Sequence, residues 1–500
     1  MIGRTAEAFA RFAQRALPSP FVFALLLTAV AFLAGLVVGR PAAQSLVARA
    51  GDLVAMWYGG DLLGAATGES RPIGGVVASG GFALALQMCL ILATGYALAA
   101  APPIARALRR LAGLPRREPA AAATVALVAM VAAWLNWGFG LVVGAVFARE
   151  VYRAARDRGE RWHYPLLGAA GYLGLMVWHG GFSGSAPLAV AQANHDHHAI
   201  YGIVPTAKTL FAPLNLGLNA ALLLLMPLLF AGLARAARAG RERALAAGRP
   251  LAEAAPIWTL PDERHGSASG AAVAVVAPAP GAATPTERLD DSRLLAGMVV
   301  LLAGGALALL VHVRGLSGAL SLPSVSVAFL TAGVALHGSV GRFGRAFTEA
   351  GGELSGILLQ FPFYYGILGL VDESGVGVAL AEQSLMVTRG LVALGLPVET
   401  AFSWVTFATA CVLNMFVPSG GGQWAIQGGI AGSAALALGL DPSRAVLLVA
   451  YGDEASNMIQ PFWVMTLLSI TGLKAGEILA WSSLAMVAAM PVFLLALAIW

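Results

Sequence analysis

The chain has 500 residues, of which 58% are hydrophobic and 11% are charged, and its formal net charge is +5. Soluble globular domains carry about 25% charged residues, so the composition excludes an ordinary soluble domain and indicates a membrane protein. The arginines concentrate in a few loops between apolar runs, as expected of cytoplasmic loops, so the positive charge does not indicate nucleic-acid binding. Cys89 and Cys411 lie within apolar stretches, which argues against a disulfide framework.

Apolar runs close to the roughly 20 residues needed to cross a bilayer recur along nearly the whole chain. The first follows Arg4, Arg11 and Arg15 and is too long for a signal peptide, which predicts a retained span and a cytoplasmic N-terminus. The pattern indicates an all-α polytopic (multi-pass) protein of the bacterial cytoplasmic, or inner, membrane. Regular spans are predicted at residues 19–38, 81–101, 206–232, 294–313, 320–338, 354–372 and 478–499.

The segment at residues 234–293 differs from its surroundings, because it is rich in arginine and contains an Ala/Gly/Pro run at 270–285. This composition is typical of a partly disordered cytoplasmic linker. It divides the chain into a first transmembrane repeat at 1–233 and a second at 294–500.

Two irregular stretches are predicted to be re-entrant helical hairpins, at about 119–152 and about 400–438. In the first, apolar arms shorter than a span flank NWGFG at 136–140, and arginines on both sides indicate that both ends are cytoplasmic. In the second, the arms flank NMFVPSGGGQW at 414–424, with few basic residues nearby. A segment that begins and ends on one face has to turn back inside the membrane.

Each hairpin is followed by an apolar stretch that small and polar residues interrupt. The first, at about 164–193, contains WHGGFSGSAP, and the second, at about 443–470, contains YGDEASNMIQP. Non-helical backbone at membrane depth persists only where protein buries it or water reaches it. These stretches therefore predict two broken transmembrane helices.

The order of landmarks is similar in the two halves, and the extra span at 294–313 reverses the orientation of the second. An inverted-topology repeat is therefore predicted, as in many secondary transporters. The matched landmarks are LPS at 17–19 and 322–324, LQM at 86–88 and LQF at 359–361, Asn136 and Asn414, and Tyr172 and Tyr451.

The hairpin tips and helix breaks are expected to converge on a cavity that suits a small carboxylate, because half-helix N-termini present free N–H groups and glycines allow close approach. The glycines could instead allow close helix packing. The serines could instead donate hydrogen bonds to backbone carbonyls. The candidate contacts are Asn136, Gly138, Gly140, Ser183, Ser185, Asn414, Ser419, Gly420, Gly421, Gln423, Asn457 and Gln460. Four further side chains could line the same cavity: Gln87, Gln360, Tyr364 and Tyr365.

Asp453 and Glu454 are predicted to couple transport to an ion, because ionisable residues inside an apolar stretch are costly and mark ion or proton pathways. The alternative is a wet vestibule or a structural cap. His179 is a third candidate, as a proton site, although a single buried histidine is commonly a hydrogen-bonded filler. HDHH at 195–198 is interpreted as a solvated loop rather than a metal site. No metal or cofactor is expected beyond a coupling H⁺ or Na⁺.

Several long segments carry a family resemblance: LPSPFVFALLLT (17–28), NWGFGLVVGAVFARE (136–150), YPLL (164–167), GGFSGS (180–185), QFPFYYGI (360–367), VPSGGGQWAIQG (417–428) and the stretch from AYG (450–452) to QPFW (460–463). In these segments the chain resembles the short-chain fatty acid transporter family over nearly its full length. The resemblance implies a small monocarboxylate substrate. A wider similarity to ion transporters with paired re-entrant hairpins implies an elevator-like movement and a possible homodimer.

Two features depart from that family's pattern, namely a longer loop between Trp57 and Gln87, and His179 itself. Three functions remain open. The first is secondary transport of short-chain fatty acid anions of the acetate, butyrate and acetoacetate class, in which membrane lipid and substrate are the partners. The second is cation/proton antiport through Asp453 or Glu454. The third is an intramembrane serine hydrolase built on GFSG at 181–184, which needs a histidine base.

The sequence contains no ATP-binding P-loop, which argues against a primary pump. The serine hydrolase is disfavoured because the GFSG motif is not duplicated in the second half and His179 is the only nearby candidate base, so a transporter rather than an enzyme is expected. The exact substrate, the coupling ion and the direction of transport stay open at this stage.

Overall fold

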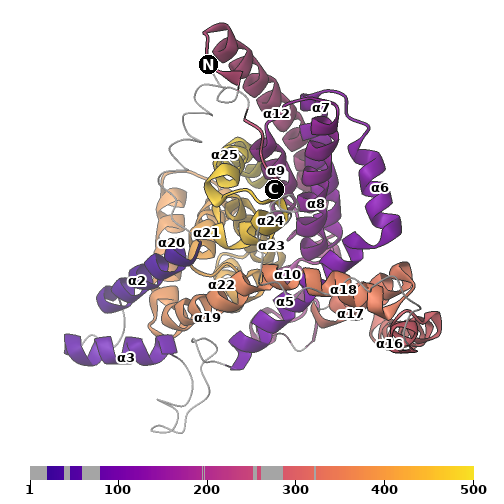
Figure 1. Cartoon of the computed structure of the whole chain (residues 1–500). Helices are drawn as coiled ribbons and strands as arrows, with labels where there is room; N and C mark the ends of the chain where they lie inside the picture. Colours follow the sequence, from indigo (N-terminus) through magenta and orange to yellow (C-terminus); the bar gives the residue numbers. More distant parts are fainter. Residues whose placement is uncertain are drawn as a thin grey trace.

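The computed structural model describes residues 20–38, 45–58, 79–193, 195, 197–251, 256–260, 285–319 and 322–500. All regular secondary structure within them is helical (Figure 1). The first half contains α2 (Pro20–Val38), α3 (Leu46–Tyr58), α5 (Ser79–Ala100), α6 (Pro102–Ala112), α7 (Glu118–Leu135), α8 (Trp137–Asp157), α9 (Tyr164–Tyr172), η1 (Leu173–Met176), α10 (Ser185–Ala189), α11 (His198–Tyr201), η2 (Thr206–Lys208) and α12 (Pro213–Ala246).

The second half is built from a similar series. It contains α15 (Pro285–Asp290), α16 (Arg293–Ala319), α17 (Leu322–His337), α18 (Val340–Glu349), α19 (Gly351–Glu373), α20 (Val376–Ala393), α21 (Val398–Phe416), α22 (Gly420–Ala437), α23 (Pro442–Ser456), η3 (Asn457–Ile459), α24 (Pro461–Thr471) and α25 (Ala475–Ala498). The order of hairpin, broken helix and long helix is the same in both halves. The inverted orientation and the division into two repeats and a linker stay predictions.

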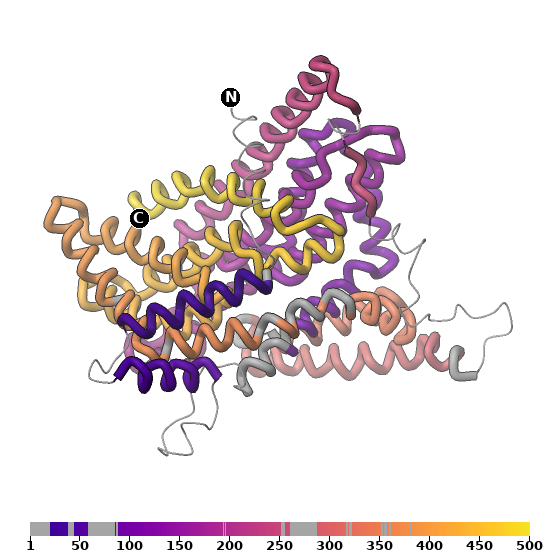
Figure 2. The backbone as a smooth tube through the Cα atoms, turned by 60° about the vertical axis from the view of Figure 1, so that its left-hand side comes forward, coloured from indigo at the N-terminus to yellow at the C-terminus, as the bar shows by residue number. Residues whose placement is uncertain are grey.

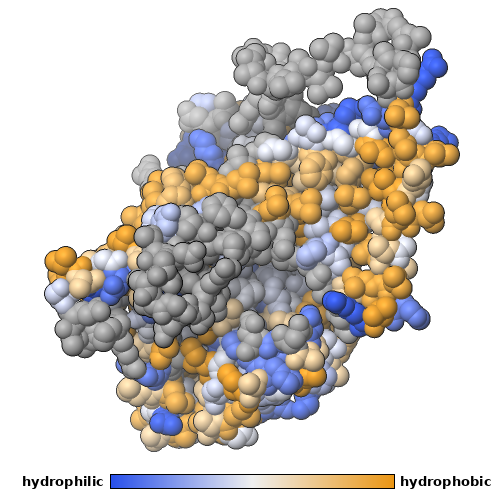
Figure 3. Space-filling model, turned by 90° about the horizontal axis from the view of Figure 1, so that it is seen from below, coloured by the Kyte–Doolittle hydropathy of each residue, from blue (hydrophilic) through white to orange (hydrophobic). Residues whose placement is uncertain are grey.

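Six described helices are long and apolar enough to cross a membrane: α2, α7, α12, α16, α20 and α25. α5 and α6 together make a seventh candidate, bent by 70° between them. Large apolar side chains are exposed on many of these helices, and they cover much of the surface seen in Figure 3. Such a surface is suited to lipid rather than water. The all-α polytopic membrane fold is therefore confirmed.

One membrane-length helix, α20, was not among the predicted spans. Glu382, Gln383, Thr388 and Arg389 interrupt its apolar residues, so its sequence has weaker hydropathy than the other spans. It packs against α21 and α22, the helices of the second hairpin. Packing of this kind lets a helix with polar positions exist at membrane depth.

The two predicted helical hairpins are present. α7 and α8 fold back on each other at Asn136, where a Cβ atom at Gly140 would lie 2.3 Å from the Cα of Ala133. α21 and α22 are joined by residues 417–419. The arms of the first hairpin are longer than predicted, at 18 and 21 residues, because both helices continue into their charged flanks.

The two broken helices are also present. In the first, helix ends at Met176 and resumes only at Ser185, and the intervening stretch contains Gly180, Gly181 and Gly184. In the second, η3 is followed by Gln460 in an extended conformation before α24. Pro461 accounts for this break, because it lacks an N–H group and disfavours a helical residue before it.

The C-terminal helices lie in the middle of the molecule, so the two halves interlock. α24 packs against α8 and α25 packs against α9, with α7 and α8 on one side of them and α20 and α21 on the other (Figure 1). One buried core accordingly contains side chains from both halves. α16 lies along an edge of the molecule instead and is mostly exposed (Figure 2).

The start of the predicted linker is helical, because α12 runs through residue 233 to Ala246 and projects beyond the other helices (Figure 2). Residues 256–260 then contact the body of the protein. There the backbone N–H of Trp258 donates to the hydroxyl of Tyr152 at 3.0 Å, and Leu260 is fully buried. The Ala/Gly/Pro run at 270–285 falls almost entirely outside the described residues.

Candidate functional site

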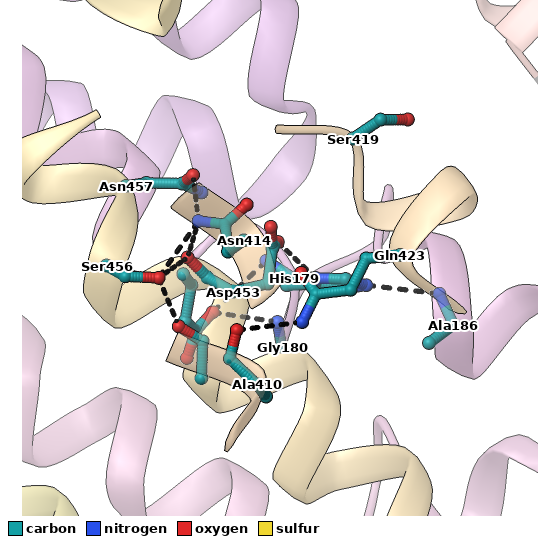
Figure 4. A network of polar contacts seen from close by, with 12 residues as sticks. His179, Gly180, Ala186, Ala410, Asn414, Ser419, Gln423, Asp453, Ser456 and Asn457 are labelled. Carbon is teal, nitrogen blue, oxygen red and sulfur yellow. Dashed lines mark hydrogen bonds and ion pairs between the residues drawn. The ribbon is translucent and has the colours of Figure 1, made fainter. Parts of the chain in front are cut away.

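The three candidate ion-coupling residues form one cluster where the two halves meet. His179 lies in the first break, and its Nδ1 is 2.6 Å from Oδ2 of Asp453 on α23. Oε2 of Glu454 accepts hydrogen bonds from the backbone N–H groups of His179 and Gly180, both at 3.2 Å. All three side chains are fully buried, and Figure 4 shows His179 beside Asp453.

The hydrogen bonds of His179 fix its tautomer. The backbone N–H of Ala186 donates to Nε2 at 3.1 Å, so Nε2 is an acceptor and carries no proton. The ring proton then sits on Nδ1 and is donated to Asp453. A second proton on Nε2 would place two hydrogen-bond donors opposite each other, since the N–H of Ala186 already points at that nitrogen. In this arrangement His179 is a neutral donor that orients Asp453.

The two neighbouring carboxyl groups lack a counter-charge. Oδ1 of Asp453 and Oε1 of Glu454 are buried and have no hydrogen-bond partner among the described residues. Two ionised carboxylates in a buried site without a cation are strongly disfavoured. The cluster is therefore suited to take up a proton or a small cation.

Amide side chains connect this cluster to the second hairpin. Nδ2 of Asn414 donates to the backbone oxygen of Asp453 at 3.0 Å and to Oδ1 of Asn457 at 3.0 Å. Nε2 of Gln460 donates to the backbone oxygen of Asn414 at 2.9 Å. The structure thus brings three predicted site residues, Asn414, Asn457 and Gln460, together at the second break. Oδ1 of Asn414 and Nδ2 of Asn457 are buried without a partner in the described part of the chain.

The two matched tyrosines each reach toward the break of the opposite half. The hydroxyl of Tyr172 donates to the backbone oxygen of Asn457 at 2.8 Å. The hydroxyl of Tyr451 donates to Oδ1 of Asn215 at 3.2 Å, and Nδ2 of Asn215 donates to the backbone oxygen of Gly180 at 2.8 Å. Asn215 was missed in the sequence, although a fully buried amide in an apolar helix is itself a signal.

The tip of the first hairpin is closed by its own residues. Oδ1 of Asn136 accepts from the N–H of Phe139 at 3.0 Å, and Oγ of Ser183 accepts from the N–H of Trp137 at 2.9 Å. A Cβ atom at Gly181 would lie 2.1 Å from the backbone oxygen of Trp134. Capping and close packing thus describe the contacts of Asn136, Gly140 and Ser183. Gly138 and Ser185 lie at the same junction, on α8 and at the start of α10.

The tip of the second hairpin is more open. Oγ of Ser419 caps α22 by accepting from the N–H of Gly422 at 3.2 Å, and Ser419 points away from the Asp453 network (Figure 4). A Cβ atom at Gly420 would lie 2.7 Å from Cε1 of His179, whereas one at Gly421 would meet nothing within 4 Å. The second tip therefore touches the ion-coupling cluster through Gly420.

Gln423 lies one turn into α22 and is fully buried. Its Nε2 donates to the backbone oxygen of Ala410 at 2.9 Å and to Oε1 of Gln427 at 3.0 Å. Its own Oε1 has no partner among the described residues. Gln423 thus holds the two arms of the second hairpin together and keeps one acceptor free.

A cavity of about 310 Å³ lies beside the second tip. Tyr364 and Tyr365, which the sequence suggested as cavity residues, line it, whereas the side chains of Gln87 and Gln360 lie outside the described ones. Tyr364 is 4% exposed, and its hydroxyl has no hydrogen-bond partner in the described part of the chain. The other lining residues are Leu368, Val417, Pro418, Ser419, Gly422 and Phe462. The N-terminus of a helix and a phenolic O–H group are both able to bind a small carboxylate.

The geometry does not favour a serine nucleophile in the GFSG motif. Oγ of Ser183 accepts the N–H of Trp137, while the ring nitrogens of His179 contact Asp453 and Ala186. His179 therefore has no free nitrogen with which to activate Ser183. In the HDHH segment, His195 and His197 contact the backbone oxygens of Gly202 and Trp424, and no group of three potential metal ligands occurs among the described residues.

Comparisons with known proteins identify the family. A family model described as short chain fatty acid transporter matches residues 1–242 and 274–500. A protein of Escherichia coli named "Putative short-chain fatty acid transporter" is 33% identical over 100% of both chains. A protein of the same name from Haemophilus influenzae is 32% identical over 99% of both. The YdaH transporter of Alcanivorax borkumensis superposes with a TM-score of 0.42 at 17% identity, over 97% of this chain and 98% of that one.

Proposed function

Because the chain belongs to the short-chain fatty acid transporter family, we propose that it carries short-chain monocarboxylates of the acetate, butyrate and acetoacetate class across the bacterial cytoplasmic membrane together with protons. The observation that carries the proposal is the cavity at the N-terminus of α22, which is lined in part by Tyr364, a residue whose hydroxyl has no hydrogen-bond partner among the described residues. The proposed orientation has the N-terminus and the arginine-rich end of α12 in the cytoplasm.

The residues that line this cavity include partners for both the carboxylate and the alkyl chain of a short fatty acid anion. The carboxylate would accept hydrogen bonds from the first N–H groups of α22 and from Tyr364, with the partial positive charge of the helix N-terminus adding to the attraction. The alkyl chain would contact Leu368, Val417 and Phe462.

Proton coupling is supported by the buried carboxyl pair. Asp453 accepts from neutral His179, so a proton taken up by the pair would reside on Glu454 or on the free oxygen of Asp453. Protonation removes the repulsion between the two groups. Gly420 lies against His179 and belongs to the tip that lines the cavity, so protonation would change the packing of the tip that holds the substrate.

The test uses the purified protein in proteoliposomes. We expect saturable butyrate counterflow that acetate and acetoacetate inhibit and succinate does not, and net uptake driven by an inward proton gradient. Asp453→Asn combined with Glu454→Gln should abolish gradient-driven uptake but retain measurable counterflow, because exchange needs no net proton movement. Full gradient-driven uptake in the double variant would contradict the coupling, and absence of counterflow with every monocarboxylate would contradict the substrate.

A second candidate function is cation/proton antiport. Four buried oxygens without partners among the described residues could together ligate Na⁺, those of Asn414, Gln423, Asp453 and Glu454. The same proteoliposomes separate the two functions. Antiport gives proton release when a sodium gradient is imposed without any carboxylate, whereas the proposed symport gives none.

A further inference from the structure

A groove between α7 and α12 lies apart from the hairpin tips and the helix breaks. Its lining residues lie on the part of α12 that projects from the body, which Figure 1 shows, and on the neighbouring start of α7. Its lining comes from the start of α7 and the second half of α12: Arg117, Pro119, Ala120, Ala123, Ala231, Arg235, Arg238, Ala239 and Glu242. The transport function proposed above uses none of these residues.

The arginines of the groove mark the level at which the apolar part of each helix ends. Arg117 directly precedes α7, whose remaining residues after Glu118 are uncharged. Arg235 is the first charged residue of α12, which is uncharged from Pro213 onward. Basic residues at the ends of apolar helices lie at the depth of lipid headgroups on the cytoplasmic side.

The positive charge of this groove is only partly neutralised. Both oxygens of Glu118 are bound by Arg241, and the backbone N–H of His163 also donates to Oε1, at 2.7 Å. Glu242 is bound by Arg238 at 2.9 Å. Within the described part of the chain, Arg117 and Arg235 form no ion pair, and both are exposed. The acidic residues closest to them in sequence, Glu118 and Glu242, are already paired with Arg241 and Arg238.

We propose that this groove binds an anionic phospholipid of the cytoplasmic leaflet. Its phosphate would lie between Arg117 and Arg235, where arginine can form charge-assisted hydrogen bonds to phosphate oxygens. The acyl chains would run along Ala120, Ala123 and Ala231, whose small side chains leave the space empty. A free anion would fill the arginine end alone and leave this apolar part uncovered. The bound lipid would bridge α12 and the first hairpin beside the Glu118–Arg241 pair.

The experiment compares lipids that remain bound after reconstitution of the full chain in vesicles of equal phosphatidylglycerol and phosphatidylcholine, followed by extraction and native mass spectrometry. Wild type should retain phosphatidylglycerol selectively. Arg117→Gln with Arg235→Gln should lower retention at least tenfold, since each basic residue near the membrane contributes about a factor of five. The matched control is Arg106→Gln with Arg109→Gln on α6, two exposed arginines outside the groove, which should retain the lipid.

A second variant keeps every charge and fills the apolar part of the groove. Ala120 is exposed, so Ala120→Trp should fold normally and yet lose phosphatidylglycerol. Equal retention in the Arg117/Arg235 variant and in the α6 control would overturn the proposal. Displacement of the lipid by millimolar inorganic phosphate, with no effect of Ala120→Trp, would also overturn it, because the site would then recognise an anion rather than a lipid. Butyrate counterflow is a separate readout, so failure of either proposal can be recognised without the other.

Discussion

The two hairpin tips each contain an asparagine and glycines, but their surroundings differ. At the first tip, Ser183 and Asn136 satisfy the N–H groups at the start of α8, and the backbone of Trp134 contacts Gly181. At the second tip, Ser419 caps α22, but open space adjoins Gly421 and a cavity adjoins Gly422. One tip is a packed structural junction, and the other is accessible to a ligand.

The two hairpins also differ at their bases, the ends that lie away from the tips. The first hairpin begins at Glu118, which is 2% exposed and is bound by Arg241 of α12. The second hairpin ends near Asp441, whose ion pair with Lys208 is about half exposed on both sides. The ion pair of the first hairpin is therefore a buried anchor, whereas the Lys208–Asp441 pair is an exposed and weaker one. The second hairpin is the one that adjoins the cavity.

The largest expected effect concerns these two ion pairs. Arg241→Gln leaves Glu118 buried without a counter-charge and should lower the free energy of unfolding by about 3–5 kcal/mol. Lys208→Gln removes an exposed pair and should cost less than about 1 kcal/mol. Thermal unfolding in neutral detergent compares the two variants. Equal losses of stability would show that the bases are anchored alike and would remove this part of the contrast.

The second prediction concerns the glycines at the tips. Gly140→Ala places a Cβ atom 2.3 Å from the backbone of Ala133, and overpacking of this kind costs about 1–3 kcal/mol or more. Gly421→Ala introduces no contact within 4 Å and should leave the unfolding temperature unchanged while weakening butyrate exchange. If Gly421→Ala unfolds as readily as Gly140→Ala, the second tip is as closed as the first.

The sequence identified both hairpins and both breaks because their signals are local. NWGFG and VPSGGGQW interrupt apolar runs, and Pro461 disfavours a helical conformation at Gln460. It did not identify α20 as a span, because five polar or charged residues lower its hydropathy. It also did not show that α12 continues past residue 233, since a helix with many arginines resembles a polar linker in composition.

The roles of the candidate residues were less predictable, because they depend on partners far away in the sequence. Asn136 and Asn414 occupy matched positions, yet Asn136 caps its own helix and Asn414 bonds to α23. His179 contacts Asp453 across 274 positions of the chain. No local pattern specifies such a contact, nor the Nε2 bond to Ala186 that fixes the proton on Nδ1.

The third prediction tests the open cavity with two tyrosines. Tyr364→Phe removes a hydroxyl that has no partner within the described structure, so stability should not fall. If the hydroxyl binds the carboxylate, the KM for butyrate should rise about tenfold, as for a lost hydrogen bond to a charged group. Tyr172→Phe is the matched control, because it removes a bond to the carbonyl of Asn457 and should lower stability by about 1 kcal/mol. An unchanged KM in Tyr364→Phe would place the carboxylate elsewhere.

The smallest expected effect is the pH dependence of the stabilisation that the exposed Lys208–Asp441 pair gives to the second hairpin. Burial alone would raise the pKa of Asp441, but the hydrogen bonds from Lys208 and Ser443 outweigh it and lower that pKa below its ordinary value of 3.8. As pH falls below about 4, the unfolded chain takes up this proton before the folded protein does, so the stabilisation from Asp441 is present above that pH and is lost below it.

Asp441→Asn keeps a side-chain oxygen that can accept from the N–H of Ser443 and removes only the titrating charge. The difference in unfolding free energy between wild type and Asp441→Asn should be below about 1 kcal/mol at pH 7, because the pair is exposed, and should shrink toward zero near pH 3. A constant difference across this range would mean that Asp441 acts as a helix cap alone. The Lys208–Asp441 pair would then add no electrostatic stabilisation to the base of the second hairpin, and the contrast with the buried Glu118 would be sharper still.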